Sequence, residues 1–398
     1  MIMENKKTKN LAICSSIGIM LLLGLYYCWS VFSNTLVEVY GWNYSEASLP
    51  YSICNICYAL AIFVFGFVYE KIGPKKTLLI SVTMMCIGLL GSGLLFGKKT
   101  VALFYGLFYG GGSSGCYTSS MSTLLKWVPE RRRALFSGLA TGAYGLAGVY
   151  TSLIANALTI ARGVPFTFVA FACAIIPLLL LADCFMLLPE KNSKENIEDT
   201  EEKALDDIPL KSAIKLRRFW FILIIYLFGC AAGNAIIGNI SNIASLQSNI
   251  KNSVFFVSLM AFCNCAGRLI GGLLGDRFKK KTVLSTVLLL DVISLLLFRF
   301  YNSAPLLIIG TLITGFAFGC EMCLIPPFLT EYFGVEYYSE IYGAVIGVGC
   351  ITGLIGPQLA GRLVDVFGSF NPVYILCACY IGVACLLAFL LPEGRAEV

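Results

Sequence analysis

The chain has 398 residues, of which 58% are hydrophobic and only 13% are charged, and its mean hydropathy is +0.81. Soluble globular domains carry about twice that share of charged residues, so most of this protein's surface does not face water. Because the chain contains no histidine, the Cys/His signatures of zinc and haem sites are excluded, and we expect neither a metal nor a cofactor.

Apolar runs of roughly 20 residues follow one another along the chain, each long enough to cross a hydrocarbon core of about 30 Å. They lie near residues 11–33, 48–69, 77–97, 100–124, 135–159, 165–188, 219–243, 253–274, 282–301, 305–329, 341–361 and 371–391. The first run is too long for a signal-peptide core, so we expect it to be retained. Runs of this length without period-two alternation exclude a barrel. The sequence therefore predicts an all-α membrane protein of twelve transmembrane helices.

Lysine and arginine are distributed unevenly over the predicted loops. If the N-terminus is cytoplasmic, 22 of the 29 basic residues lie in cytoplasmic segments and 6 lie in outer loops. Such a bias sets the orientation of membrane proteins, so we interpret the net charge of +6 as a topology signal and expect no nucleic-acid partner. We expect a multi-pass protein of the cell (inner) membrane, surrounded by the lipid bilayer, with both termini cytoplasmic and a monomer as its functional unit.

The two halves of the sequence resemble each other at a nearly constant offset. Gly66, Glu70, Lys71 and Lys75 correspond to Gly272, Asp276, Arg277 and Lys281 at an offset of 206. Gly115-Cys116 matches Gly319-Cys320 at 204, and Leu188-Pro189-Glu190 matches Leu391-Pro392-Glu393 at 203. We therefore expect two pseudo-symmetric six-helix bundles, at 1–188 and 219–398, joined by a charged cytoplasmic linker at 189–218. Related halves that face each other across a midplane site are typical of secondary transporters.

The repeated loop has a mechanical interpretation. Gly66 and Gly272 would let two helices approach closely. An acid and a base follow at each helix end, and these pairs are Glu70-Lys71 and Asp276-Arg277. Such charges can lock helix ends on one face of the bundle and release them when the halves move. Topogenic charge with helix capping is the alternative, but two copies at the same topological place favour a gate.

Arg268 is a basic residue inside an apolar run. It lies eight residues from Asp276, or about 12 Å along a helix axis, which places it near the middle of the membrane. A cation there costs about 2.5–3.5 kcal/mol on insertion scales, so it should face a cavity and a partner. Its guanidinium matches the edge of a carboxylate, although it could instead snorkel or pair with Glu321.

Two acidic residues also lie within apolar runs. Glu321 could be a substrate-site residue that carries a coupling proton, or it could be the counter-ion of Arg268. Asp291 is expected to have a structural role.

Aromatic residues in three predicted helices could form the wall of a binding cavity, where rings exclude water and hydroxyl groups donate hydrogen bonds. These residues are Tyr26, Tyr27, Trp29, Tyr117 and Tyr144. Helix packing is the alternative for each of them. No Ser/His/Asp or Cys/His set is present in the sequence, so we do not expect an enzyme.

The loop from Gly66 to Lys76 resembles the signature of the major facilitator superfamily between its second and third helices. Further segments resemble the oxalate/formate antiporter family, which is related to the monocarboxylate porters. They are Tyr27-Cys28-Trp29-Ser30-Val31-Phe32, Tyr40-Gly41-Trp42, Lys126-Trp127-Val128-Pro129-Glu130-Arg131-Arg132, Asn264-Cys265-Ala266-Gly267-Arg268, Glu331-Tyr332-Phe333-Gly334 and Gly356-Pro357-Gln358-Leu359-Ala360-Gly361.

This resemblance implies a site. The family's oxalate carrier holds a dianion between an arginine, which corresponds to Arg268, and a lysine, whose position falls at about Gly349 in this chain. The second cation is therefore missing. The resemblance also implies that the aromatic residues named above enclose the substrate. Arg133 is a further departure, because the family usually has glycine there.

The expected function is secondary active transport of small organic anions by alternating access, with Arg268 binding the anion. One surviving cation favours monocarboxylates of the lactate, pyruvate or formate type. The coupling partner would be H⁺ or a counter-anion. An oxalate:formate-type exchanger, and an efflux carrier of the superfamily for another small molecule, are the alternatives.

Overall fold

The computed structural model of the chain describes residues 2–189, 207–248, 254–392 and 394, and this part contains helices and no strand. The helices are α1 (Ile2–Leu22), α2 (Trp29–Glu38), α3 (Tyr44–Leu94), α4 (Lys98–Val101), α5 (Gly110–Trp127), α6 (Arg133–Asp183), α7 (Leu210–Ala213), α8 (Arg217–Ser248), α9 (Val254–Arg277), α10 (Lys280–Leu297), α11 (Ala304–Phe333), α12 (Tyr338–Phe367) and α13 (Asn371–Leu390). Short 3₁₀ or π segments are η1 (Gly24–Cys28), η2 (Ala102–Tyr109), η3 (Glu130–Arg132) and η5 (Phe298–Phe300). Most of the predicted linker, residues 190–206, lies outside the described residues.

The predicted spans are all found as helices. Within the described residues, 8 helical stretches are long and apolar enough to cross a membrane by length and composition. Two of them, α3 and α6, contain two spans each, because Gly73 (φ 81°) and Gly163 (φ 83°) interrupt the helical backbone. Helix α5, with η2 before it, and helix α12 supply the two remaining spans. The prediction of an all-α membrane protein with twelve spans is confirmed.

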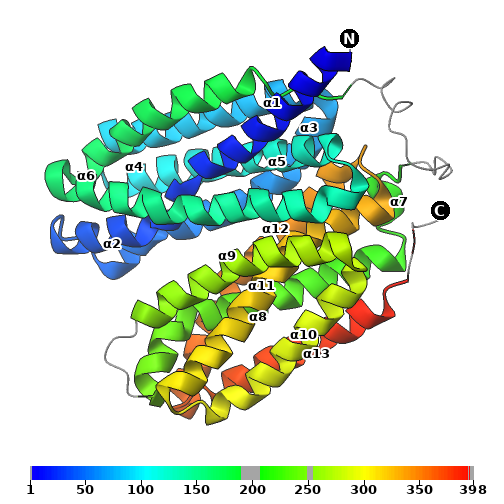
Figure 1. Ribbon diagram of the computed structural model, residues 1–398. Helices are drawn as coiled ribbons and strands as arrows, with labels where there is room; N and C mark the ends of the chain where they lie inside the picture. Colours follow the sequence, from blue (N-terminus) through cyan, green and yellow to red (C-terminus); the bar gives the residue numbers. More distant parts are fainter. Residues whose placement is uncertain (1, 190–206, 249–253, 393, 395–398) are drawn as a thin grey trace.

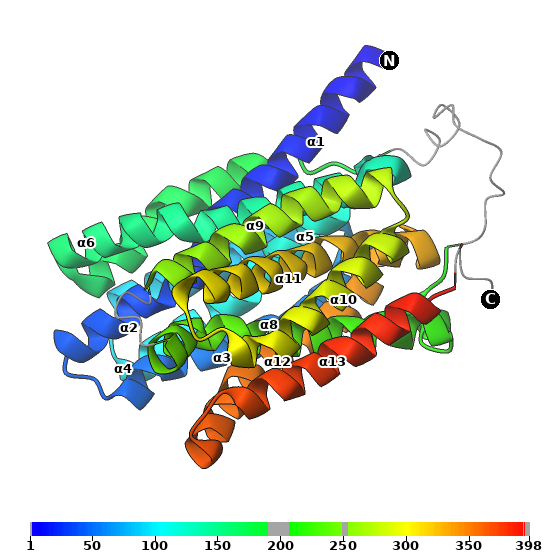
Figure 2. The ribbon, with the colours of Figure 1, turned by 60° about the horizontal axis from the view of Figure 1, so that its bottom comes forward.

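The helices run side by side, and their ends gather at two ends of the molecule (Figures 1 and 2). One end carries both termini and α7, and we call it the linker end (Figure 1). The opposite end, where α2 and the Gly163 turn lie, we call the far end. Helices α1 to α6 occupy the upper part of Figure 1, and α8 to α11 and α13 the lower part. Helix α12 packs closely on α3, and α9 packs on α6, so these two helix pairs join the halves.

The α3–α12 crossing is close because glycine stands on both helices. A Cβ at Gly66 of α3 would collide with the Ser339 carbonyl of α12. A Cβ at Gly343 of α12 would stand 2.7 Å from the Ile62 carbonyl of α3. Either methyl group would push the two backbones apart, so the crossing depends on the small residues.

The α6–α9 crossing is built in the same way. A Cβ at Gly138 of α6 would collide with the Arg268 carbonyl of α9, and a Cβ at Gly272 of α9 would stand 2.6 Å from the Ala134 carbonyl of α6. Every position has its counterpart in the other crossing at an offset of 205 or 206, and the equivalent positions are 66 and 272, 134 and 339, 138 and 343, and 62 and 268. The sequence repeat is thus a repeat of backbone contacts, with Arg268 where the first half has Ile62.

Candidate functional site

Arg268 lies in α9 and is half-buried at the α6–α9 crossing. Its Nε donates a hydrogen bond to Asn264 Oδ1 (2.9 Å), one turn earlier on the same helix. Its Nη1 donates to the Thr141 carbonyl of α6 (2.6 Å). Gly145, one turn further along α6, lies beside the guanidinium, and a Cβ there would be in van der Waals contact with Nη1 at 3.8 Å. The arginine side chain therefore connects the two halves of the protein.

The charge of Arg268 has no acidic partner among the described residues. The ion pairs in this part of the chain are Lys98–Glu46, Lys126–Glu70 and Lys280–Glu331. The two groups that accept hydrogen bonds from Arg268 are an amide and a carbonyl, both neutral, and its Nη2 donates none within the described residues. A carboxylate would supply the missing negative charge and accept from the unused donors.

A row of tyrosine rings begins close to this guanidinium. The ring centroids of Tyr27 and Tyr144 are 5.0 Å apart, those of Tyr144 and Tyr117 are 5.3 Å apart, and Tyr117 stacks on Tyr342 at 6.3 Å. The Tyr342 hydroxyl donates to the Tyr117 hydroxyl (3.0 Å). Tyr144 lies one turn from Thr141 on α6, which brings the row next to the carbonyl that Arg268 binds. We call Tyr27, Tyr144, Tyr117 and Tyr342 the tyrosine row.

Of the other two predicted aromatic residues, one extends this row and one does not. The Tyr26 ring lies 5.4 Å from the Tyr27 ring, and its hydroxyl donates to Asn55 Oδ1 (2.5 Å). The Trp29 indole donates to the Ala47 carbonyl (2.9 Å), packs on the Tyr105 ring at 4.5 Å and is 5% exposed. Helix packing, the alternative for each aromatic residue, fits Trp29.

Gly349, which stands where the resemblance places a lysine, is filled by a neighbour. The ring of Tyr226, in α8, occupies the space that a Cβ at position 349 would need. A lysine side chain therefore has no room on this face of α12 unless Tyr226 moves. This packing fits the absence of a lysine at position 349, and the sequence alone did not indicate Tyr226.

Glu321 of α11 is 1% exposed, and both of its carboxyl oxygens lie directly over the backbone of Gly229 in α8. Its Oε1 has no hydrogen-bond partner within the described residues. Because the donors of Arg268 are directed to Asn264 and Thr141, the structure does not bring this carboxyl and the guanidinium together as an ion pair.

The other acid of the C-terminal half, Asp291 of α10, is 4% exposed. Its Oδ1 accepts a hydrogen bond from the Thr314 hydroxyl of α11 (2.7 Å). This contact joins two neighbouring helices of one half, as a structural role requires.

At the linker end, each half supplies an acid that caps a helix of the other half. Asp276, at the end of α9, accepts hydrogen bonds from the backbone N–H groups of Ala134 and Leu135 (both 3.0 Å), in the first turn of α6. Glu70 of α3 accepts from the N–H of Ser339 (3.4 Å), in the first turn of α12. A carboxylate at a helix N-terminus is favourable because it pairs unsatisfied N–H groups and opposes the helix dipole. We call these contacts the linker-end clamp.

The bases of the clamp differ from the predicted ones. Glu70 forms an ion pair with Lys126 of α5 (2.9 Å), and the same ammonium donates to the Glu336 carbonyl in the C-terminal half (3.2 Å). Lys71 forms no ion pair within the described residues, and the Arg277 guanidinium lies over the Phe278 ring at 5.8 Å. Neighbouring residues on a helix do not face each other, so the acid–base dipeptides of the sequence could not pair internally.

Sequence reasoning missed several residues at the site. Asn264, Thr141, Tyr226 and Tyr342 contact predicted site residues, but none of them is a charged residue in an apolar run, which was the property used to find Arg268. The spacing of Asn264 and Arg268, four residues apart, was the one pattern in the sequence that places both on one helix face.

Helices in two related halves, close crossings between them and capped helix ends on one face are the plan of a membrane transporter. The sequence model of the Major Facilitator Superfamily matches residues 14–357 and again residues 240–397. The chain therefore belongs to the major facilitator superfamily and is a secondary transporter, not an enzyme.

Relatives of known name cover most of the chain. It is 24% identical to the uncharacterized MFS-type transporter YhjX of Escherichia coli over 353 residues, which make up 87% of this chain and 87% of the relative. It is 24% identical to monocarboxylate transporter 12 of Homo sapiens, over 88% of this chain and 73% of that protein. It is 22% identical to the probable sulfoacetate transporter SauU of Cupriavidus necator, over 90% of this chain and 87% of the relative. Among solved structures, the Escherichia coli fucose:proton symporter FucP superposes with a TM-score of 0.71 at 16% identity, over 95% of this chain and 99% of that chain.

Proposed function

We propose that this protein carries small organic anions of the monocarboxylate class, and that Arg268 binds the carboxylate. The observation that carries this proposal is the guanidinium itself, which lies between the halves with two neutral acceptors and no acid among the described residues. The names of two relatives, a monocarboxylate transporter and a probable sulfoacetate transporter, support an organic anion as cargo.

The number of cations at the site limits the charge of the cargo. One guanidinium neutralises one carboxylate, and the position of a second cation at Gly349 is occupied by the Tyr226 ring. A dianion would carry an uncompensated charge into a region of low dielectric constant, which is costly. A lactate-, pyruvate- or formate-type monocarboxylate therefore fits better than the dianion of an oxalate:formate-type exchanger.

The hydrogen bond between Arg268 and Thr141 suggests how binding is coupled to movement. A carboxylate that pairs with both ends of the guanidinium would take Nη1 as well as the unused Nη2, and Nη1 is the donor that now joins α9 to α6. Binding of the anion thus competes with a contact between the halves and weakens the α6–α9 crossing. The Gly138 and Gly272 contacts and the Asp276 cap on α6 are the interactions of this crossing that must then break for the linker end to open.

We propose that the linker end faces the cytoplasm. The lysine and arginine bias of 22 to 6 places this end inside, as positively charged loops are retained on the cytoplasmic face. In the described arrangement the halves are joined at this end, so the site would be reached from the outer side. The protein would belong to the cell (inner) membrane and act as a monomer.

The coupling ion depends on Glu321. This carboxyl is buried, and its Oε1 has no hydrogen-bond partner within the described residues, so a cycle in which it gains and loses a proton would give H⁺ symport. If Glu321 remains protonated throughout, the protein exchanges one anion for another. An efflux carrier for another small molecule would use Glu321 rather than Arg268 as the principal substrate contact.

Counterflow in liposomes tests the proposal. Liposomes that contain the wild-type protein and are preloaded with unlabelled lactate, pyruvate or formate should accumulate the labelled anion. Liposomes with Arg268→Gln should not, because the positive charge that binds the anion is gone. Arg299→Gln, at a surface arginine that lies over the Phe300 ring, is the matched control and should transport normally. Normal counterflow by a folded Arg268→Gln protein would overturn the site.

The same vesicles separate symport from exchange. A proton gradient should drive net uptake only in a symporter, and Glu321→Gln should abolish that uptake while leaving counterflow. If a pH gradient has no effect on the wild type, the exchanger is the correct mechanism.

A further inference from the structure

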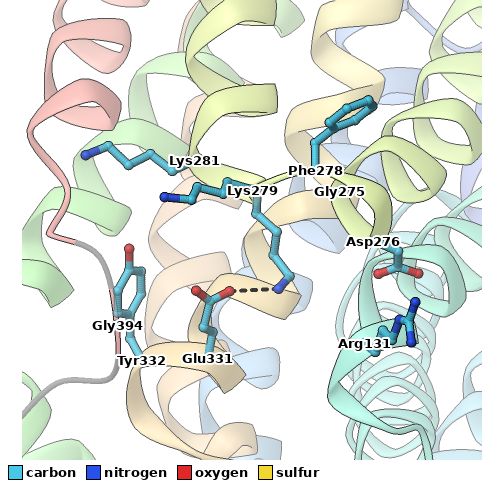
Figure 3. A pocket seen from close by; sticks show the side chains of 10 residues that line it. Arg131, Gly275, Asp276, Phe278, Lys279, Lys281, Glu331, Tyr332 and Gly394 are labelled. Carbon is cyan, nitrogen blue, oxygen red and sulfur yellow. Dashed lines mark hydrogen bonds and ion pairs between the residues drawn. The ribbon is translucent and has the colours of Figure 1, made fainter.

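Two adjoining hollows at the linker end lie outside the site described above. The first has a volume of about 270 Å³ and is lined by residues of the α9–α10 turn, the end of α11 and Arg131 (Figure 3). The second has a volume of about 720 Å³ and follows the seam between α6 and α9. Arg131 and Asp276 line both hollows, so the two hollows lie next to each other.

The first hollow is basic. Its charged lining residues are four bases, Arg131, Lys279, Lys280 and Lys281, and two acids, Asp276 and Glu331. Both acids are already engaged: Glu331 pairs with Lys280 (2.8 Å; Figure 3), and Asp276 caps α6. Neither Arg131 nor Lys281 forms an ion pair within the described residues, although Asp276 lies beside Arg131 (Figure 3) and the Lys281 ammonium donates to the Leu391 carbonyl (2.6 Å). A ligand that fits here carries negative charge.

The second hollow is apolar along its length and basic at its mouth. Leu135, Ile270, Leu273 and Leu274 line the apolar part, and Leu273 is 53% exposed. Arg131, Arg132 and Arg277 stand at the end nearest the first hollow. Exposed leucine and isoleucine next to a basic rim match a molecule with a hydrocarbon chain and an anionic head.

From this arrangement we propose that an anionic phospholipid binds at the α6–α9 seam. Its phosphate lies among Arg131, Arg132 and Arg277, and one acyl chain lies along the Leu135–Leu273 groove. Basic pockets between transmembrane helices on the cytoplasmic side suit such headgroups. The inference rests on the proposed orientation, because the linker end must lie at the level of one leaflet's headgroups.

The position of the lipid gives it a role in the transport cycle. Arg131 belongs to the N-terminal half and Arg277 to the C-terminal half, so one phosphate binds both. The bound lipid stabilises the arrangement in which the linker end is closed, in addition to the Asp276 cap on α6. Anionic lipid in that leaflet would therefore favour the state that is open at the far end.

Native mass spectrometry of the purified full-length protein tests the proposal. With phosphatidylglycerol the wild type should retain at least one lipid adduct that phosphatidylcholine does not give. The double substitution Arg131→Gln and Arg132→Gln should weaken that binding by about tenfold or more, because two headgroup cations are lost. Substitution of Lys98 and Lys99 by glutamine, at the opposite end of the molecule, is the matched charge control and should leave it unchanged.

A second variant tests the acyl-chain groove without altering charge. Leu273→Trp should fill the groove and displace phosphatidylglycerol, whereas Leu296→Trp, at an equally exposed leucine of α10, should not. If inorganic phosphate or glycerol phosphate competes as well as the lipid, the pocket takes free phosphate and the proposal is wrong. Equal binding of both lipids, or wild-type binding by both the arginine variant and Leu273→Trp, would also overturn it. Because the readout is lipid binding, these outcomes do not depend on which anion is transported.

Discussion

The aromatic ring of Tyr226 in α8 occupies the space beside Gly349 of α12, so the side chain at one position limits the size of the other. Either residue could be changed alone, but a larger side chain at 349 requires a smaller one at 226. This relationship connects the packing of the C-terminal half with the charge of the cargo.

Gly349→Lys alone is expected to be destabilising, because overpacking a closed site costs about 1–3 kcal/mol. Combined with Tyr226→Ala, the lysine should fit and add a second cation near Arg268. The double variant should then prefer a dicarboxylate such as oxalate over formate, as measured by competition in counterflow, and its thermal stability should recover. Tyr226→Ala alone is the control for the space created. An unchanged preference in a stable double variant would show that position 349 does not face the substrate.

Asn264→Asp should make anion binding depend on pH. An aspartate beside Arg268 supplies an internal counter-ion, so its ionised form competes with the substrate carboxylate. Protonation removes that competition, and transport should therefore rise as the pH falls. Uptake measured at several pH values in Asn264→Asp and in wild type checks the sign, and Asn264→Ala shows the effect of losing the amide alone.

Asp276→Ala should loosen the first turn of α6. Loss of an N-cap costs about 1 kcal/mol, which corresponds to about fivefold faster exchange of the amide hydrogens of Ala134 and Leu135. Hydrogen–deuterium exchange with mass spectrometry of the peptide that covers this turn measures the change. Glu38→Ala, at an exposed acid at the far end of the molecule, should leave the peptide unaffected. Unchanged exchange in Asp276→Ala would contradict the role of the clamp.

Gly229→Ala should destabilise the protein through its contact with Glu321. The added methyl group would collide with the carboxyl oxygens, and overpacking of this kind costs about 1–3 kcal/mol. Thermal unfolding in detergent should show a lower midpoint, which Glu321→Ala in the same chain should partly restore. Gly382→Ala in α13, where nothing lies within 4 Å of a new Cβ, should be neutral or slightly stabilising. An equal effect of both glycine substitutions would refute the specific collision.

Much of the fold could be predicted from the sequence, because hydrophobic length and basic loops are local properties. The repeat at Gly66 and Gly272 even indicated where helices approach closely. The identity of the helix that each glycine meets is a tertiary property, and it emerged only from the structure.

The candidate site was less predictable. Arg268 could be found because a cation in an apolar run is rare, whereas Tyr226 and Thr141 are ordinary residues in their own helices. Their importance comes from contacts between α8 and α12 and between α9 and α6. The ion pair of Glu70 with Lys126 was missed for a similar reason, since these residues are distant in sequence and come together only when α3 packs on α5.

The exchange of Ile62 for Arg268 between the two crossings has a mechanical consequence. Both crossings have the same glycine contacts, but only the α6–α9 crossing has Arg268, the residue proposed to bind the anion. An anion bound there acts on one side of the molecule, while the α3–α12 crossing keeps its glycine contacts unaltered. The two halves would then separate first between α6 and α9, while α3 and α12 stay in contact and act as the hinge.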